Sequence, residues 1–454
     1  MSEAIYPAPF AAATVAPLPT FAEATRVWLR IGCLSFGGPA GQIALLHREV
    51  VDERNWISDR RFLHALNFCT LLPGPEAQQL AIYLGWLLHG ARGGAVAGLL
   101  FVVPGALVML ALSVTYVVFG EIPVVAALFF GIKSAVLVLV IDALLRVGRR
   151  ALKTRFAWIL AAVAFAALFF LTVPFPVVVL AAGLVGYLVP NGFVGVSHGA
   201  VTHTAPALLD SVLEGDPGRA GRMARSARRG GIAAAVLWLL PFAFLQRGGF
   251  FTEIAWFFSK MAVVTFGGAY AVLAYVAQQA VTHYHWLSPS EMLAGLGLAE
   301  TTPGPLILVL QFVGFLAGYR ESGISGGVAA SALTLWMTFA PCFAFVFLGA
   351  PLVERLQGNR QLSGALAAIT ASVVGVIANL SVWFALHSLF QTTMRVQTGW
   401  LSFDAPVMSS LDPWALLLSA IAAIALVRLK LGIPRTLGIC AVAGVLLRLV
   451  HGAI

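Results

Sequence analysis

The chain has 454 residues, of which 60% are hydrophobic and only 10% are charged. This composition excludes a water-soluble globular protein, in which about a quarter of the residues are charged. The mean hydropathy of +0.91 and the 45 glycines fit helices packed closely in a lipid bilayer. The net charge of +9 resides in short loops and a short linker, so the chain lacks the basic soluble domain of a nucleic-acid-binding protein. We expect a lipid bilayer as a partner and no nucleic acid.

Stretches that are apolar and long enough to cross a bilayer follow one another along most of the chain. Residues 1–20 contain no Lys or Arg and no apolar signal-peptide core, and they predict a disordered tail. Beyond this tail, about thirteen stretches lie near residues 21–47, 61–89, 93–119, 121–147, 156–172, 174–190, 232–249, 251–281, 291–319, 324–351, 361–390, 411–428 and 433–451. Glycines and prolines interrupt several of them. The sequence predicts an all-α polytopic membrane protein in which some helices are broken or re-entrant.

A polar segment with a cluster of arginines separates the two halves of the chain. We expect one half at residues 21–190, a basic cytoplasmic linker at 191–231, an extra connecting helix at 232–250 and the other half at 251–454. Loops on the side of the N-terminus carry about twice as many Lys and Arg residues as loops on the opposite side, a bias that predicts a cytoplasmic N-terminus.

The two halves repeat the same motifs at a spacing of 230 residues, without a gap over more than fifty residues. The matches are Ser35-Phe36-Gly37-Gly38 with Thr265-Phe266-Gly267-Gly268, Trp56-Ile57-Ser58 with Trp286-Leu287-Ser288, and Pro73-Gly74-Pro75 with Pro303-Gly304-Pro305. An odd number of segments separates the first helices of the halves, so we expect the second half to be inverted. Inverted repeats are typical of secondary transporters, whose substrate sites lie near the membrane midplane between the repeats.

The repeated glycine and proline motifs are candidate substrate-binding segments. Glycine relaxes a helix and proline removes a hydrogen-bond donor, and a broken helix presents free amide groups to an anion. Close helix packing or a simple kink is the alternative for the glycine pairs, and a loop at the membrane edge is the alternative for Pro-Gly-Pro. The candidate binding residues here are Ser35, Gly37, Gly38, Pro73, Gly74, Pro75, Thr265, Gly267, Gly268, Thr302, Pro303, Gly304 and Pro305.

Two cations occupy equivalent positions of the repeat. Arg30 and Lys260 each lie five residues before a Phe-Gly-Gly sequence, and a cation inside a membrane is a candidate functional residue. The alternative is that both side chains reach the membrane surface. Glu23 and Glu253 lie seven residues earlier, on the same helical face, and are candidate ion-pair partners.

Other polar residues near the motifs suggest proton transfer or hydrogen bonding. Glu76 follows the first Pro-Gly-Pro and Glu300 precedes the second, and either carboxyl group is a candidate for proton coupling. The candidate hydrogen-bonding side chains are Gln42, Gln78, Gln79 and Gln311. Lys133 and Asp142 have no charged repeat mates, and packing or topology accounts for them.

Several classes of chemistry have no motif in this sequence. His283 and His285 lie in a polar loop without further metal ligands nearby, so we expect no metal site. The four cysteines form no Cys-x-x-Cys pair. Phosphate-binding loops, nucleophile elbows and haem attachment motifs are absent too. We expect neither an enzyme nor a cofactor.

The marked residues resemble the signature segments of the two-domain chromate ion transporter family. They are Leu29-Arg30-Ile31-Gly32, Ser35-Phe36-Gly37-Gly38-Pro39, Leu72-Pro73-Gly74-Pro75-Glu76-Ala77-Gln78-Gln79 and Ala299-Glu300-Thr301-Thr302-Pro303-Gly304-Pro305. The resemblance extends from about residue 21 to residue 451. The second half has Ala269 where the first has Pro39, so its break is expected to be softer.

This resemblance implies a secondary transporter that exports chromate across the bacterial inner membrane and confers chromate resistance. Membrane potential or a proton gradient would drive it, and one half would rock against the other. A transporter of sulfate or another oxyanion is the alternative function, and a membrane oxidoreductase is a distant one. A homodimer is compatible with the sequence, which does not set the oligomeric state.

Overall fold

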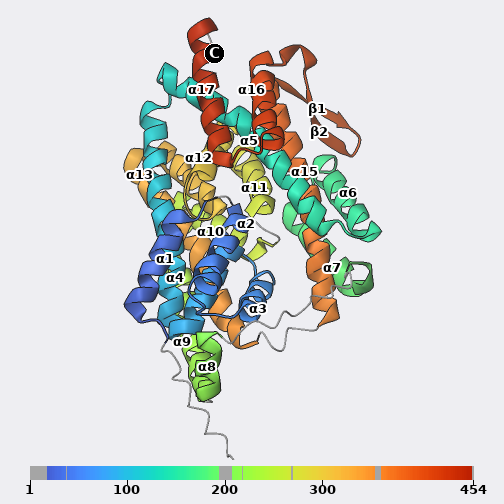
Figure 1. Cartoon of the computed structure of the whole chain (residues 1–454). Coiled ribbons are helices and arrows are strands. Elements are labelled where there is room, and N and C mark those ends of the chain that lie inside the picture. The colour runs from blue at the N-terminus through green and yellow to red at the C-terminus, as the bar shows by residue number, and fades with distance from the viewer. Residues whose placement is uncertain are drawn as a thin grey trace, which may run out of the picture.

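The fold comes from a computed structural model that describes residues 18–36, 38–193, 207–216, 218–266, 269–352 and 359–451. It is a bundle of helices of very different lengths (Figure 1). We call its lower end in that view the α8 end, after α8 (Leu208–Gly215), and its upper end the β end, after a two-stranded hairpin. Among the described residues, five helical segments are long and apolar enough to cross a membrane: α4 (Glu76–Phe119), α5 (Pro123–Ala151), η5 with α13 (Leu306–Gly349), α15 (Arg360–Leu389) and α17 (Ile433–His451).

The first half begins with two pairs of short helices. These pairs are α1 (Phe21–Leu34) with α2 (Gly38–His47), and α3 (Asp59–Cys69) with the first part of α4; a π-helical turn, η1 (Arg48–Asp52), extends α2. The Thr20 side chain caps α1 by accepting a hydrogen bond from the Glu23 amide at 3.3 Å. Both pairs are interrupted at the glycine and proline motifs, as the sequence predicts.

Each pair of short helices is a hairpin that starts and finishes at the α8 end. A ring nitrogen of His89, beyond the second hairpin, donates to the Pro19 carbonyl, before the first, at 2.8 Å. The Asn55 carbonyl, between the hairpins, accepts from the Leu208 amide of α8 at 3.2 Å. The hairpin tips therefore point toward the middle of the bundle.

A sharp turn inside α4 separates the second hairpin from a long helical arm. Gly90 has a φ of 65° in this turn, a backbone conformation that glycine adopts readily. The two sides of the turn are in close contact, because a Cβ added to Gly85 would lie 2.5 Å from the Gly93 carbonyl oxygen. The arm runs to the β end, α5 returns, and the short helices α6 (Arg155–Phe169) and α7 (Phe175–Leu188) pack on α15.

A long helix crosses the boundary expected between the linker and the connecting helix. α9 (Arg219–Leu239) runs through the boundary expected at residue 231, so its first turns carry the arginine cluster. α8 lies in the same expected linker, and a 3-10 turn, η3 (Leu240–Ala243), follows α9. The rest of that linker, residues 194–206 and 217, lies outside the described residues.

The second half repeats the order of the first. Its elements are α10 (Phe250–Val264), α11 (Ala269–Gln278), η4 (Gln279–His283), α12 (Pro289–Thr301), η5 (Leu306–Leu308), α13 (Val309–Gly349), η6 (Ala350–Leu352), α15, α16 (Pro413–Ala423), η8 (Ile424–Arg428) and α17. α13 contains the same turn as α4, with Gly323 at a φ of 70°. A Cβ added to Gly318 would lie 2.3 Å from the Gly326 carbonyl oxygen.

The hairpins of the second half start and finish near the β end. Glu291, at the start of α12, pairs with Arg320, beside the α13 turn, at 2.7 Å. The Phe312 ring contacts the Tyr116 ring near the end of α4, with centroids 5.3 Å apart. The tips of these hairpins therefore approach the tips of the first half from the opposite end.

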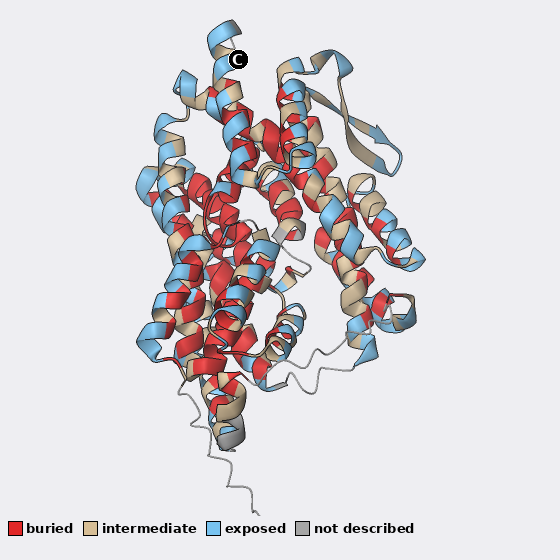
Figure 2. Ribbon diagram, in the orientation of Figure 1, coloured by how far each residue is buried: buried red, intermediate tan, exposed pale blue. Residues whose placement is uncertain are grey.

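The buried residues gather along the middle of the bundle, where the two halves meet (Figure 2). Large apolar side chains are exposed on its outer helices, and Leu180 on α7 is 71% exposed. A bilayer is the solvent in which such a surface is stable.

The all-α prediction misses one small β element. β1 (Thr393–Thr398) pairs antiparallel with β2 (Leu401–Pro406), and Arg395 lies opposite Asp404. The Ser402 amide donates to the Phe170 carbonyl at 2.9 Å, which ties the hairpin to the loop between α6 and α7. The number of membrane crossings and the inversion of the second half stay predictions.

Candidate functional site

The hairpin tips of the two halves are joined by a reciprocal pair of hydrogen bonds. The Gly74 amide donates to the Thr265 carbonyl, and the Gly304 amide donates to the Ser35 carbonyl, both at 2.8 Å. Gly74 and Gly304 are repeat mates, as are Ser35 and Thr265. The motifs that the sequence marks as candidate binding segments therefore meet at one place in the fold.

The backbone at this meeting point explains why each Pro-Gly-Pro motif has glycine at its centre. Gly74 has a φ of 123° and Gly304 a φ of 93°, in the region that residues with a Cβ rarely adopt. The Gln42 side-chain amide donates to the Gly304 carbonyl at 2.5 Å, and that of Gln79 donates to the Pro73 carbonyl at 2.7 Å. These side chains stabilise unwound backbone that has no helical partner.

A cavity of about 250 Å³ lies next to these tips. Three groups of residues form it: the starts of α2, α4 and α11, the last turns of α5, and positions on α12, α15 and α17. The lining residues are Gly38, Pro39, Ala40, Glu76, Ala143, Arg146, Val147, Arg150, Ala151, Tyr270, Glu300, Thr370, Ile377 and Ile433. Both halves of the chain therefore contribute to one cavity.

Three helices begin at this cavity. α2 starts at Gly38, α4 starts at Glu76, and Tyr270 is the second residue of α11. The amide groups in the first turn of a helix have no partner within the helix, and they carry partial positive charge. Such helix starts favour an anion.

Two arginines of α5 add full positive charge to the cavity. Arg146 and Arg150 lie one helical turn apart and both line it. The Arg146 guanidinium also pairs with Asp142, one turn earlier, at 2.9 Å. Guanidinium groups suit tetrahedral oxyanions because they offer several donors in a fixed planar arrangement.

Two carboxyl groups face the same arginines. Glu300 is buried and accepts a hydrogen bond from the Tyr270 hydroxyl at 2.7 Å. The positive charge of Arg150 acts on Glu76, and that of Arg146 acts on Glu300. An anion bound between the arginines would compete with these carboxylates, so their protonation would favour binding.

The predicted cations do not line the cavity. Arg30 is exposed and lies 3.5 Å from Glu49, a buried carboxylate that also pairs with Arg54 at 2.7 Å. Lys260 is exposed on α10. Glu23 and Glu253 are exposed as well, and within the described part of the chain neither forms an ion pair with its expected partner.

Other predicted residues lie at or near the tips. Gln78 is fully buried, and neither atom of its amide has a hydrogen-bond partner among the described residues. The Thr302 hydroxyl donates to the Ala299 carbonyl at 3.0 Å. Pro75 precedes α4 and Pro305 precedes η5, and the Pro303 carbonyl packs against Gly105. Gly37, Gly267 and Gly268 lie outside the described residues.

Arg146, Arg150 and Tyr270, which line this cavity, were not among the candidate residues predicted from the sequence. A signal was present, because Asp142, Arg146 and Arg150 recur every four residues and so share one face of a helix. Contacts between segments far apart in the chain decide whether this face of α5 meets the hairpin tips. The four-residue spacing does not predict those contacts.

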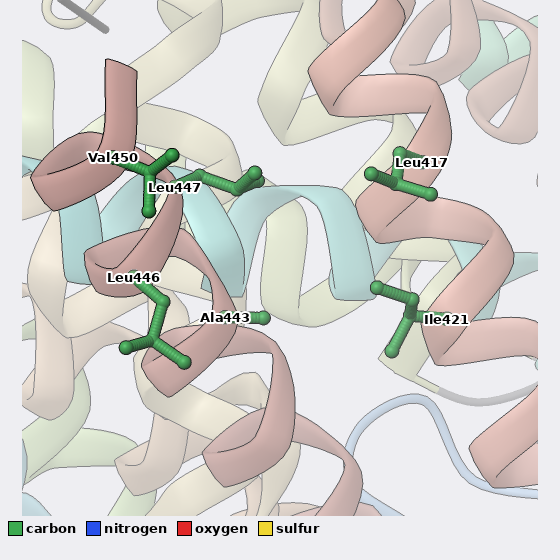
Figure 3. Close-up of a pocket in the computed structure, with 6 residues that line it drawn as sticks. All are labelled: Leu417, Ile421, Ala443, Leu446, Leu447 and Val450. Atoms are coloured by element: carbon green, nitrogen blue, oxygen red, sulfur yellow. The ribbon is translucent and has the colours of Figure 1, made fainter. Parts of the chain in front are cut away.

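A second cavity, between α16 and α17, cannot serve the same purpose. It is lined only by the apolar side chains Leu417, Ile421, Ala443, Leu446, Leu447 and Val450 (Figure 3). With no polar group, it offers no donor to an anion.

The chain is similar in sequence to a known protein family over most of its length. The family model described as chromate transporter matches residues 22–187 and 252–445. The chain is 34% identical to the chromate transport protein of Pseudomonas aeruginosa, over 81% of this chain and 82% of that protein. It is 27% identical to the chromate transport protein of Cupriavidus metallidurans, over 82% of this chain and 85% of that one.

A shorter relative matches less than half of this chain. An uncharacterized transporter of Bacillus subtilis is 32% identical over 31% of this chain and 70% of its own length. No solved structure matches the chain. With its long apolar helices, this is a multi-pass membrane protein, and it belongs to the chromate transporter family, a family of transport proteins and not of enzymes.

Proposed function

We propose that this protein exports chromate, or a similar dianionic oxyanion, across the bacterial inner membrane and thereby confers chromate resistance. The observation that carries the proposal is the cavity in which Arg146 and Arg150 face the starts of three helices. The names of the relatives from P. aeruginosa and C. metallidurans supply chromate as the cargo. Sulfate, with the same charge and nearly the same shape, is the alternative cargo.

The direction of transport follows from the proposed orientation. The α8 end carries the arginines of α9. Cytoplasmic segments are enriched in Lys and Arg, so we place this end and the N-terminus in the cytoplasm. The cavity with Arg146 and Arg150 then receives the anion from the cytoplasm.

The proposed mechanism is alternating access between two inverted halves. The approach of the hairpin tips from opposite ends, and their reciprocal hydrogen bonds, support an inverted repeat with re-entrant hairpins. In transporters of this kind one half rocks against the other around a site at the midplane. A homodimer is not required, because one chain supplies every residue of the cavity.

Membrane potential alone is sufficient to drive export. An inside-negative potential of 100 mV favours outward movement of a dianion by about 4.6 kcal/mol, which supports a gradient of roughly a thousandfold. Protons could assist through Glu76 and Glu300, which face the arginines. Coupling to protons is therefore an addition to the mechanism and not a necessity.

The test is uptake of radiolabelled chromate into inside-out membrane vesicles with an imposed potential. We expect a lumen-positive potential to drive uptake, and collapse of the potential to abolish it even when a pH gradient remains. Excess unlabelled sulfate shows whether the two anions share the site. Uptake that persists without potential or pH gradient, or a large sulfate flux without chromate flux, would contradict the proposal.

A further inference from the structure

A third cavity, of about 160 Å³, lies beneath the β1–β2 hairpin. It is formed by the end of α6, by one face of α11 and η4, by α15 and by the hairpin. Its lining residues are Leu168, Phe169, Thr172, Ala274, Gln278, Thr282, Asn379, Leu380, Trp383, Leu386, Arg395, Ser402, Phe403 and Asp404. It lies toward the β end, whereas the cavity of Arg146 and Arg150 includes the last turns of α5 toward the α8 end.

The internal repeat relates the two cavities. α5 begins at Pro123 and α15 at Arg360, 237 residues later. At this spacing, Ala143 and Arg146 of the first cavity correspond to Leu380 and Trp383 of the third, and all four line their cavities. The same face of two equivalent helices therefore borders two neighbouring cavities, one beside the hairpin tips and one beneath the β1–β2 hairpin.

The charges on these two faces differ. Asp142, Arg146 and Arg150 of α5 correspond to Asn379, Trp383 and His387 of α15. A His387 ring nitrogen donates to the Trp383 carbonyl at 2.9 Å, and the two rings lie 4.4 Å apart. The α15 face thus has no guanidinium group where the α5 face has two.

A single arginine, from the hairpin, lines the third cavity. The Nε of Arg395 donates to the Ser402 hydroxyl at 3.1 Å, and within the described part of the chain Arg395 forms no ion pair. Asp404 lies opposite it across the hairpin. Gln278 and Asn379 are partly exposed, and their side-chain amides add neutral donors.

We propose that the cavity beneath the hairpin is a second, weaker site for the same tetrahedral oxyanions, at which the cargo rests before release at the β end. The inference rests on the proposed function. One arginine with an opposing carboxylate holds a dianion less tightly than two arginines beside three helix starts. The difference between the cavities allows capture at the central cavity and release at the β end.

The test measures the concentration of radiolabelled chromate that half-saturates transport from each face of the membrane. Inside-out and right-side-out vesicles, with potentials of opposite sign, present the two faces. We expect Arg395→Gln to raise this concentration about tenfold at one face only, because a charge-assisted contact is lost. Arg146→Gln should raise it at both faces, because the alternating-access site between the halves is reached from either side. Arg247→Gln, at an exposed position outside the cavity, should change neither.

Two more variants distinguish a specific loss of chromate binding from misfolding of the protein. Arg395→Lys keeps the charge and should remain within about threefold of wild type. Asp404→Asn removes the opposing charge and should lower the half-saturating concentration at the Arg395 face about threefold. The inference is overturned if Arg395→Gln matches Arg247→Gln, if Arg395→Gln weakens both faces equally, or if Asp404→Asn has no effect. Absence of chromate flux in the wild type would instead overturn the proposed function.

Discussion

The two halves of this chain have nearly the same backbone and different charges. Helix breaks, positive-φ glycines and turns recur at spacings of 230 to 237 residues. Arg61 in α3 pairs with Asp210 of α8, whereas its repeat mate Glu291 in α12 pairs with Arg320. Arg146 in α5 corresponds to Trp383 in α15. The order of helices and breaks is therefore repeated between the halves, whereas the charged residues are not.

The largest expected effect is on the rate of chromate uptake, and it comes from the two arginines of α5 that have no counterpart in α15. Replacing Arg146 and Arg150 together by Gln removes both cations of the central cavity, and we expect the rate of chromate uptake to fall by about a hundredfold or more. Arg149→Gln is the matched control, because Arg149 is an exposed neighbour that does not line the cavity. Uptake by inside-out vesicles, normalised to the amount of protein in the membrane, measures the effect. An equal loss of uptake rate in the double variant and in the control would contradict the role of Arg146 and Arg150 in binding the anion.

A smaller effect compares the two Pro-Gly-Pro tips. Gly74→Ala and Gly304→Ala both force a Cβ into a positive-φ conformation, at a cost of about 1–3 kcal/mol. The new Cβ of Gly74→Ala would lie 2.7 Å from Gln79 Nε2 and 3.0 Å from Cys342 Sγ, whereas that of Gly304→Ala would lie 3.1 Å from Leu308 Cδ1. We expect Gly74→Ala to lower the melting temperature of the purified protein more. The reverse order would show that the tips do not pack as described.

The smallest effect concerns the ion pairs of Arg61 and Glu291. Burial alone would raise the pKa of Asp210, but hydrogen bonds from Arg61 and Ser58 outweigh it and hold the pKa below its usual value. This contribution is present above the unfolded-state pKa of about 3.9 and is lost as the pH falls through the lower folded-state pKa. Asp210→Asn should therefore cost about 0.2–1 kcal/mol at neutral pH.

The pH dependence of that variant is itself informative. The difference in melting temperature between wild type and Asp210→Asn should be constant from pH 5 to 8 and should shrink below about pH 4. Glu291→Gln gives the comparison at the other end of the molecule. A difference for Asp210→Asn that grows as the pH falls would contradict the assigned ion pair.

The sequence predicted the parts of the fold that depend on local chemistry. Pro-Gly-Pro cannot continue a helix, and the chain is unwound at residues 73–75 and 303–305. The motif match at a spacing of 230 residues indicated the duplication, and the helices of the second half recur in the order of the first. Local patterns suffice here because helix breaks are properties of the residues themselves.

The cations of the candidate site were not predictable in the same way. Arg30 and Lys260 occupy matching repeat positions, yet the first lies beside Glu49 and neither lines the cavity. Arg146 lines the cavity because α5 packs beside hairpin tips from both halves, and these contacts join segments far apart in the chain. The β1–β2 hairpin was missed because its twelve paired residues form a short strand pair between much stronger helical patterns.

Binding of chromate to the purified protein tests the central claim most directly. Equilibrium dialysis with radiolabelled chromate in detergent solution would compare wild type, the Arg149→Gln control and the variant with both Arg146→Gln and Arg150→Gln. The account predicts saturable binding to wild type and to the control, and loss of that binding in the double variant. Saturable binding that survives in the double variant with unchanged affinity would contradict the assignment of the anion site to this cavity.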